Sequence, residues 1–310
     1  INKLSITDDS IHRQINLVQI KAHCTKQVTA SAWRYEFSNA DRAVDMRSIT
    51  KMKTVTTFLV ALFSLAPVCV LSGGNTLTKS ETVDLANGAL IEVVGENAAV
   101  HIHGVQSNTL KLNVTMNNAE FVDFYTQILT GNPVSHYMVS ATTSTGGATT
   151  ANSLIEIGLP RGTKLIVRTT NKPVIVESSI LSYADISTSN GEVKIANSSG
   201  DFNLSTTNSE ITVRSVTGEI NASTTNAHVW FEGVVDKGSN SISTTNGDVS
   251  IRLEDGSNVL VSGDTHNGDV TINGNDKSIR KDGDTATFTY GTGNETATLA
   301  ITNGPGAIHI

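Results

Sequence analysis

Short runs of alternating apolar and polar residues dominate the second half of the chain. Apolar residues take every second position in pairs such as Val193 and Ile195, Ile211 and Val213, and Val249 and Ile251. A period of two directs one set of side chains inward and the other toward solvent. Turns containing Asn, Ser and Gly separate the runs, so the pattern predicts many short β-strands.

A Thr-Thr-Asn motif, or a close variant, precedes most of these strands. The motif asparagines lie at positions 171, 190, 208, 226, 246 and 267, spaced by 19, 18, 18, 20 and 21 residues. A second turn, such as Gly200-Asp201, divides most units into two strands. One unit cannot bury its inward face alone, whereas stacked units share a continuous core. We therefore predict an all-β protein, a single-stranded β-solenoid (β-helix) with coils of about 18–20 residues and two short strands per coil. A β-sandwich and a β-propeller are the alternatives.

The two ends of the repeat are less regular. The last motif asparagine, Asn303, follows Asn267 by 36 residues, which predicts that one coil is degenerate or replaced by a hairpin. Residues 75–165 are expected to form the N-terminal β-rich portion of the same domain, and residues 166–310 the solenoid repeats. Within the first portion, residues 121–129 (FVDFYTQIL) are the best helix candidate, with a strand as the alternative.

Several of these segments resemble a known family. The run LIEIGLPRGTKLIVRTTN, the serial TSNGEVKI and TTNGDVSI units and the closing ITNGPGAIHI are similar to the bacterial putative-adhesin domain family. The resemblance covers roughly residues 80–310 and implies an exported β-solenoid-like domain of unestablished biochemical role. The chain departs from the family pattern at Lys172-Pro173 and Ala227-His228, where Gly followed by Asp or Glu is typical. The resemblance implies no functional residues.

The beginning of the chain predicts export. Residues 46–74 combine Arg47 and two lysines with an apolar run and then small residues, the layout of a secretory signal peptide. A retained anchor is the alternative. A lipoprotein signal prefers a small residue before its cysteine, so Val68 before Cys69 argues against a lipoprotein. Residues 1–45 begin with Ile and show no sustained period, so we interpret them as a non-native upstream extension, with a disordered extension as the alternative.

Composition and charge narrow the class further. Charged residues make up 16% of the chain and aromatic residues 5%, with 25 glycines, which fits short strands and polar turns. Residues 75–310 contain 13 basic and 24 acidic residues, a net charge of −11, and no cysteine. An acidic chain without a basic patch argues against a nucleic-acid partner. The missing cysteines exclude disulfides and thiolate chemistry from this region.

The stacked register predicts two columns of side chains. Equivalent positions of successive coils lie about 4.8 Å apart, so the motif amides should form an Asn ladder of Asn190, Asn208, Asn226, Asn246 and Asn267. Two positions further on, an acidic ridge should contain Glu192, Glu210, His228, Asp248 and Asp269. Such a ridge could recruit calcium or serve a polysaccharide-cleaving enzyme. The simpler interpretation is a set of solvated turn residues.

Two further features are candidate sites. Trp230 lies between the inward Val229 and Phe231, so it should point outward and is a candidate binding residue together with the acidic ridge. His101 and His103 share one face of a predicted strand and could hold a metal. No third ligand is evident, so we expect an exposed strand face there and no metal site.

These observations favour a non-enzymatic protein. The chain contains no nucleotide-binding fingerprint and no Gly-x-Ser-x-Gly motif, and we expect no cofactor. We predict an exported, adhesin-like β-solenoid with a surface or periplasmic binding or structural role. Its partner would be an unknown envelope component or a glycan, and the mature chain would not span a membrane. The alternative is a polysaccharide lyase or hydrolase that uses the acidic ridge.

Overall fold

The computed structural model is almost entirely β-strand in the part of the chain that it describes. The described residues are 68–72, 76–143, 151–235, 237–266, 270–271, 280–282, 285–291 and 297–310. Within these ranges the one helical element is a 3₁₀ turn at Ala119–Phe121, and no helix is long and apolar enough to cross a membrane. The strands form two sheets, A and B, joined through the long strand β2 (Thr76–Gly95), whose first half lies in sheet A and second half in sheet B.

Sheet A is one layer of the structure. In spatial order it contains β1 (Val68–Ser72), the first half of β2, β4 (Thr109–Asn117), β7 (Asn152–Leu159), β3 (Ala98–Gly104), β9 (Val174–Glu177), β11 (Val193–Ala196), β13 (Ile211–Thr217), β15 (Val229–Val234), β17 (Val249–Leu253), β23 (Ile308–His309) and β19 (Val270–Thr271). From β7 to β19 every pairing is parallel. Strand β1 falls inside the predicted signal segment, so a chain cleaved near residue 75 would lack it.

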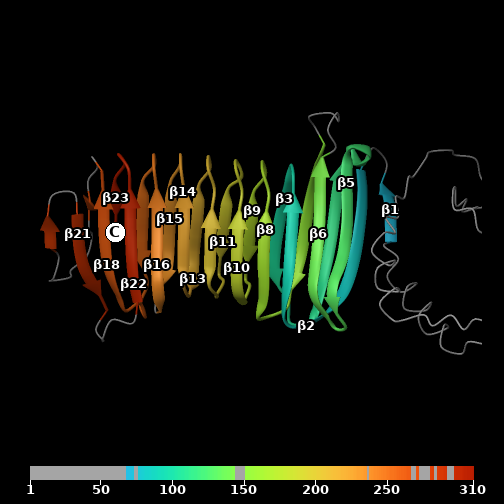
Figure 1. Ribbon diagram of the computed structural model, residues 1–310, viewed down its shortest axis with the longest axis horizontal. Coiled ribbons are helices and arrows are strands. Elements are labelled where there is room, and N and C mark those ends of the chain that lie inside the picture. Colours follow the sequence, from blue (N-terminus) through green and yellow to red (C-terminus); the bar gives the residue numbers. More distant parts are fainter. Residues whose placement is uncertain are drawn as a thin grey trace, which may run out of the picture. The chain divides into compact units, whose positions relative to one another are not determined.

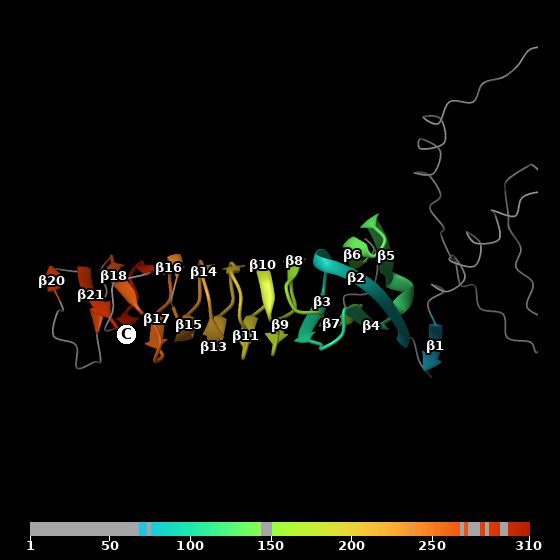
Figure 2. The same cartoon turned by 90° about the horizontal axis from the view of Figure 1, so that it is seen from below.

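Sheet B is the opposite layer. In spatial order it contains β5 (Val122–Gly131), β6 (Val134–Thr143), the second half of β2, β8 (Thr163–Arg168), β10 (Leu181–Ser187), β12 (Phe202–Ser205), β14 (Ile220–Thr224), β16 (Gly238–Thr244), β22 (Ala297–Asn303), β18 (Val259–Thr265), β21 (Thr285–Tyr290) and β20 (Arg280–Asp282). Its pairings are parallel except at the two ends, where β5 and the β21–β20 pair are antiparallel. Figures 1 and 2 show the stacked strands and the two layers.

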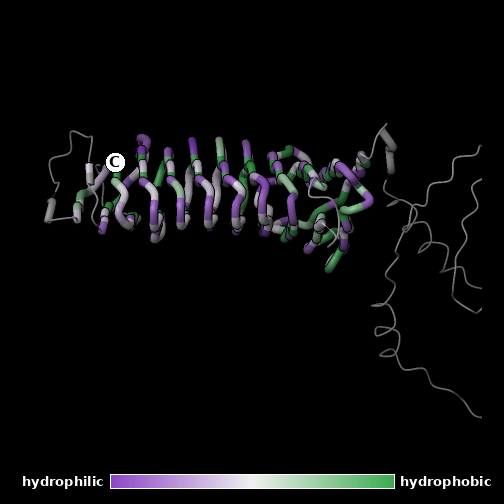
Figure 3. The backbone as a smooth tube through the Cα atoms, turned by 90° about the horizontal axis from the view of Figure 1, so that it is seen from above, coloured by the Kyte–Doolittle hydropathy of each residue, from purple (hydrophilic) through white to green (hydrophobic). Residues whose placement is uncertain are grey.

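Each regular coil contributes one strand to each sheet. Strand β10 lies in sheet B, β11 crosses to sheet A, and β12 returns to sheet B beside β10. Neighbouring coils are in register, so that Val193 is paired with Val174 on one side and Ile211 on the other. Alternate residues are buried between the sheets, and the hydropathy changes sign repeatedly along each coil (Figure 3). The prediction of an all-β, single-stranded β-solenoid with two short strands per coil is confirmed.

The first residue of each Thr-Thr-Asn motif is buried, which explains why the motif recurs. These residues are Thr169, Thr188, Thr206, Thr224, Thr244 and Thr265, each between 3% and 6% exposed. Their hydroxyls donate to backbone carbonyls of an adjacent turn, for example Thr206 Oγ1 to the Gly191 oxygen at 3.2 Å. A buried hydroxyl is tolerated only with such a partner, and a carbonyl of an adjacent turn provides it at all six positions.

The last coil does not continue the stack but is inserted into it. Strand β22 lies between β16 and β18, and β23 lies between β17 and β19. The β20–β21 hairpin precedes this coil in the chain, as the hairpin alternative predicted. Asn303 pairs with both Thr244 and Thr265 and takes the buried threonine position, donating from Nδ2 to the Ala307 oxygen at 3.1 Å. The prediction that Asn303 is the next motif asparagine was therefore wrong. Asn303 is aligned with Thr244, the first residue of a motif, so Pro305 is aligned with the ladder residue Asn246.

At the N-terminal end, too, the coils do not stack in the order in which they occur in the chain. The β6–β7 coil stacks on one side of the β2–β3 coil, and the β8–β9 coil stacks on the other. Strands β2 to β7 therefore share both sheets and the core with the repeats. Residues 121–129 are not a helix, because most of them lie in β5, which pairs antiparallel with β6 and turns Val122, Phe124 and Thr126 toward the core.

Candidate functional site

The outer surface of sheet A carries the most varied side chains in the regular coils. Alternate residues of each strand point outward. Because the strands are parallel and in register, equivalent outward residues of successive coils form rows across the sheet. The first row runs Ile175, Lys194, Thr212, Trp230 and Ser250, and the second row runs Glu177, Ala196, Arg214, Glu232 and Arg252. We refer to these two rows as the outer face of sheet A.

Trp230 is the most exposed large apolar side chain on this face. It remains 38% exposed although the residues on either side of it, Val229 and Phe231, are 1% exposed. Thr212 and Ser250 pair with it on the flanking strands, and both are too short to cover an indole ring. The Arg214 guanidinium lies 5.9 Å from the ring centroid, within the range of a cation–π contact. The alternation therefore predicted the direction of Trp230 correctly.

A shallow depression of about 410 Å³ lies beside the tryptophan on the same face. Its charged and polar lining consists of Glu177, Glu192, Lys194, Glu210, Thr212 and Arg214. Its charged groups are three carboxylates and two cations, and Lys194 Nζ lies 2.8 Å from Glu192 Oε1. The depression thus offers hydrogen-bond donors and acceptors side by side without a strong excess of one charge.

The acidic ridge occupies the residue before each of the strands β11, β13, β15 and β17. The register aligns Glu192, Glu210, His228 and Asp248, and Ala307 follows in the inserted coil. Asp269 lies outside the described residues. Because the β22–β23 coil separates β17 from β19, the row continues beyond Asp248 with Ala307 and not with an acidic side chain.

The described members of the ridge all have partners within the protein. Thr212 donates to Glu210 Oε1 at 2.9 Å, and the Ala307 N–H donates to Asp248 Oδ1 at 2.9 Å. His228 Nδ1 accepts the Asp248 N–H at 3.0 Å, and the Asp248 carboxylate lies 3.5 Å from the same nitrogen. The contacts of Asp248 with His228 and Ala307 join the ends of neighbouring coils. They give the ridge an evident structural use.

The Asn ladder is longer at its N-terminal end than the sequence suggested. Each Nδ2 donates to Oδ1 of the preceding member at 2.7–2.9 Å, in the order Asn246, Asn226, Asn208, Asn190, Asn171 and Asn97. Asn97 is not preceded by Thr-Thr, so the motif did not identify it as a ladder residue. The alternating strand that follows Asn97 could have indicated it. Asn267 lies outside the described residues. The coil that stacks on that of Asn246 is the inserted one, with Pro305 at the equivalent position.

Removal of one ladder member should have a moderate cost. Asn208→Ala loses the hydrogen bonds to Asn190 and Asn226, and because all three amides are exposed, water replaces part of the loss. We expect the free energy of unfolding to fall by about 1 kcal/mol. Denaturant unfolding measures this change, with Thr207→Ala on the same turn as the matched control. Equal losses in the two variants would contradict a stabilising role for the ladder.

Two further groups of ionisable side chains lie on β3 and β6. His101 Nε2 lies 3.5 Å from Glu177 Oε2, and the His101 and His103 ring centroids are 6.2 Å apart. Among the described residues no group of three or more His, Cys, Asp or Glu side chains is arranged to hold a metal ion. Tyr137 is fully buried in sheet B, and burial, with Glu81 as a second cause, raises the pKa of its hydroxyl.

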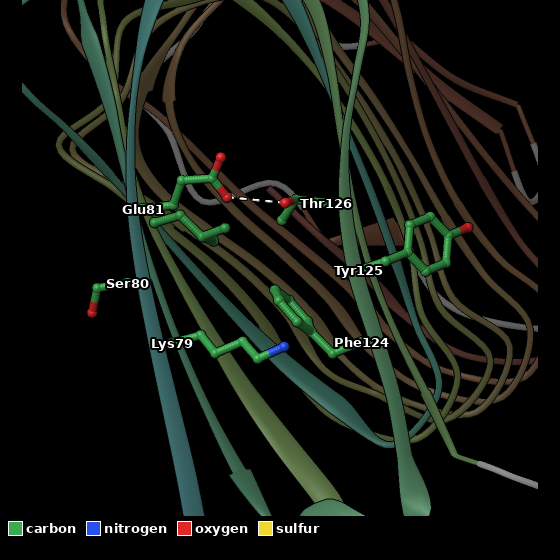
Figure 4. A pocket seen from close by; sticks show the side chains of 7 residues that line it. Lys79, Ser80, Glu81, Phe124, Tyr125 and Thr126 are labelled. Carbon is green, nitrogen blue, oxygen red and sulfur yellow. Dashed lines mark hydrogen bonds between the residues drawn. The ribbon is translucent and has the colours of Figure 1, made fainter. Parts of the chain in front are cut away.

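A smaller opening of about 160 Å³ lies between β2 and β5. Figure 4 shows Glu81 and Thr126 facing one another across it, joined by a hydrogen bond of 2.9 Å. Lys79 Nζ lies 4.8 Å from the centroid of the Phe124 ring. The opening lies beside the end strand of sheet B, away from the outer face of sheet A.

Comparison with known proteins identifies the family. A family model described as Toastrack DUF4097 matches residues 79–309. The chain belongs to the Toastrack DUF4097 family. This match agrees with the resemblance found in the sequence, and with the β-solenoid-like architecture. No curated protein matches the chain.

Three solved structures are similar to this Toastrack chain at low identity. A "putative cell adhesion protein" from Clostridium sporogenes is 14% identical, with a TM-score of 0.38 and coverage of 75% of this chain and 98% of that one. A "putative adhesin" from Parabacteroides distasonis is 11% identical, with a TM-score of 0.41 and coverage of 75% and 96%. Another from Parabacteroides merdae is 12% identical, with a TM-score of 0.38 and coverage of 77% and 97%. These TM-scores are too low to carry an argument about function.

Proposed function

We propose that the protein is an exported, adhesin-like binding protein without enzymatic activity, acting in the periplasm, at the cell surface or after secretion. The observation that carries this proposal is the exposed Trp230 with Arg214 against its ring on the outer face of sheet A. Tryptophan and arginine are the residues most enriched at binding hot spots. The signal-like segment at residues 46–74 supports export.

The chemistry of the face favours a partner rich in hydroxyl groups, such as a glycan of the envelope. An indole ring offers an apolar surface for stacking. The neighbouring depression supplies carboxylate acceptors from Glu192 and Glu210 and donors from Lys194 and Arg214. Mixed charges of this kind match a neutral polar ligand better than a strongly charged polymer.

The geometry gives less support to a polysaccharide lyase or hydrolase. In the usual glycoside hydrolase a pair of carboxylates flanks the scissile bond, one as the general acid and the other as the base or nucleophile. Here Asp248 accepts the Ala307 N–H of the inserted coil and Glu210 accepts the Thr212 hydroxyl of its own strand, so both carboxylates are already held by groups of the solenoid.

Incubation of the purified chain with envelope polysaccharides tests the proposal. We expect retention of a glycan on the immobilised protein with no shortening of the polymer, measured by size analysis after long incubation. Depolymerisation that disappears in Asp248→Asn would contradict the non-enzymatic function. Binding of an envelope protein with no glycan retention would contradict the proposed ligand class.

A further inference from the structure

The two ends of sheet B are finished differently. At one end the last strand is β20, Arg280–Asp282, which is three residues long and consists of charged residues alone. At the other end the last strand is β5, which is ten residues long and pairs only with β6 among the described strands. Short length and charge protect a sheet edge from pairing with another chain. Strand β20 has both protections, and β5 has neither.

Strand β5 also gathers exposed apolar side chains. Tyr125 is 49% exposed, Ile128 is 41% and Leu129 is 38%, so three of the seven exposed large apolar side chains in the described residues lie on this strand. Asp123 is its single charged residue. Unpaired N–H and C=O groups on an apolar edge form a template for an added strand.

From this contrast we propose that β5 pairs antiparallel with β5 of a second copy of this chain, forming a two-fold dimer in which sheet B continues from one copy into the other. The regular part of the strand is Val122–Ile128, since a bulge interrupts the register with β6 after Ile128. A two-fold axis at Tyr125 uses only this regular part.

The sequence of β5 is complementary to itself about that axis. Each Tyr125 lies opposite its counterpart, and Val122 lies opposite Ile128 of the second copy. Asp123 lies opposite Gln127 of the second copy, so a carboxylate meets an amide donor and no like charges meet. Aromatic and aliphatic cross-strand pairs of this kind stabilise antiparallel strands. Because opposite residues keep the same parity, the core-facing side of each sheet also stays on one side of the joined sheet.

The dimer is separate from the proposed binding surface. Trp230 lies on the outer face of sheet A, whereas β5 ends sheet B. A two-fold dimer would present two copies of that face, so that a repeating ligand could engage both.

Sedimentation of the full chain tests the pairing. We expect a concentration-dependent monomer–dimer equilibrium at up to about 100 μM. Tyr125→Lys places two like charges opposite one another and should lower the association constant by about tenfold or more. Tyr183→Lys is the matched control, because Tyr183 is 39% exposed on the interior strand β10 and should leave the dimer unchanged. Thermal melts by circular dichroism verify that both variants fold.

Crosslinking tests the register. With Cys24 and Cys69 replaced by serine, a mixture of the Asp123→Cys and Gln127→Cys chains should form an intermolecular disulfide, because these positions lie opposite one another. Neither variant alone should form this disulfide, because the two identical cysteines of a dimer would then be offset by four residues along the paired strands. A monomeric wild type, a dimer that persists in Tyr125→Lys, or equal crosslinking of either variant alone would each overturn the proposal.

Discussion

Replacing Val249 by aspartate is expected to lower the free energy of unfolding by roughly 4 kcal/mol or more. Val249 is fully buried in sheet A, paired with Val229 on one side and Ile308 on the other. A carboxylate at this position would find itself among apolar side chains from three coils. Burial of an unpaired charge ranks among the most destabilising changes that a single substitution can make. Denaturant unfolding monitored by circular dichroism measures the loss.

The adjacent residue provides a matched control for that substitution. Ser250 points to the opposite side of the same strand, where it is partly exposed beside Trp230. Ser250→Asp should therefore change the free energy of unfolding by no more than about 0.5 kcal/mol. Similar losses in the two variants would show that the inside–outside register is incorrect, and with it the solenoid core.

Removal of the inserted coil, residues 297–310, should destabilise the C-terminal coils to the point of local unfolding. Leu299, Ile301 and Ile308 are each at most 1% exposed. Full burial of a Leu or Ile side chain is worth about 1.5–3 kcal/mol, so the three together contribute roughly 5–9 kcal/mol. That sum is comparable to the total stability of a typical domain. Amide hydrogen exchange in β16 and β18, which lose their shared neighbour β22, reports the effect.

The same truncation distinguishes insertion from simple stacking. The units TTNGDVSI at 244–251 and THNGDVTI at 265–272 are nearly identical, so they could stack directly if nothing separated them. In the structure β22 and β23 separate them. If the truncated chain kept the wild-type exchange protection in β16 and β18, the inserted coil would not be required and the observed strand order would be contradicted.

The regular coils were predictable because local pattern and packing agree there. Strict alternation in the segments around Val193, Ile211 and Val249 determines which side chains face the core, and the motif spacing gives the coil length. The threonine at the start of each motif could be identified from the sequence as a repeated residue. Its role became clear only from the structure, because the hydroxyl's partner is a carbonyl in an adjacent turn.

The order of the terminal coils was not predictable from the sequence. A strand has the same apolar alternation whichever strand lies beside it, so nothing in the segment around Asn303 indicated insertion between earlier coils. The helix preferred for residues 121–129 was wrong for a related reason. Its apolar residues satisfy a helical spacing as well as a strand spacing, and the antiparallel pairing with β6 decides the outcome.

The candidate site was predictable in part. The outward direction of Trp230 follows from alternation alone. Its contact with Arg214 depends on the register between β13 and β15, which places the arginine diagonally across from the ring. The depression beside it likewise combines residues from β9, β11 and β13, and no local pattern identifies such a group.

Binding of a retained envelope glycan to two variants tests the central claim most directly. Trp230→Ala should weaken binding at least roughly thirtyfold, the loss expected for a hot-spot residue, measured by calorimetry on the purified chain. Tyr183→Ala removes an equally exposed aromatic from the outer side of sheet B and should leave the affinity unchanged. Wild-type affinity in Trp230→Ala, or a comparable loss in Tyr183→Ala, would contradict the assignment of binding to the outer face of sheet A.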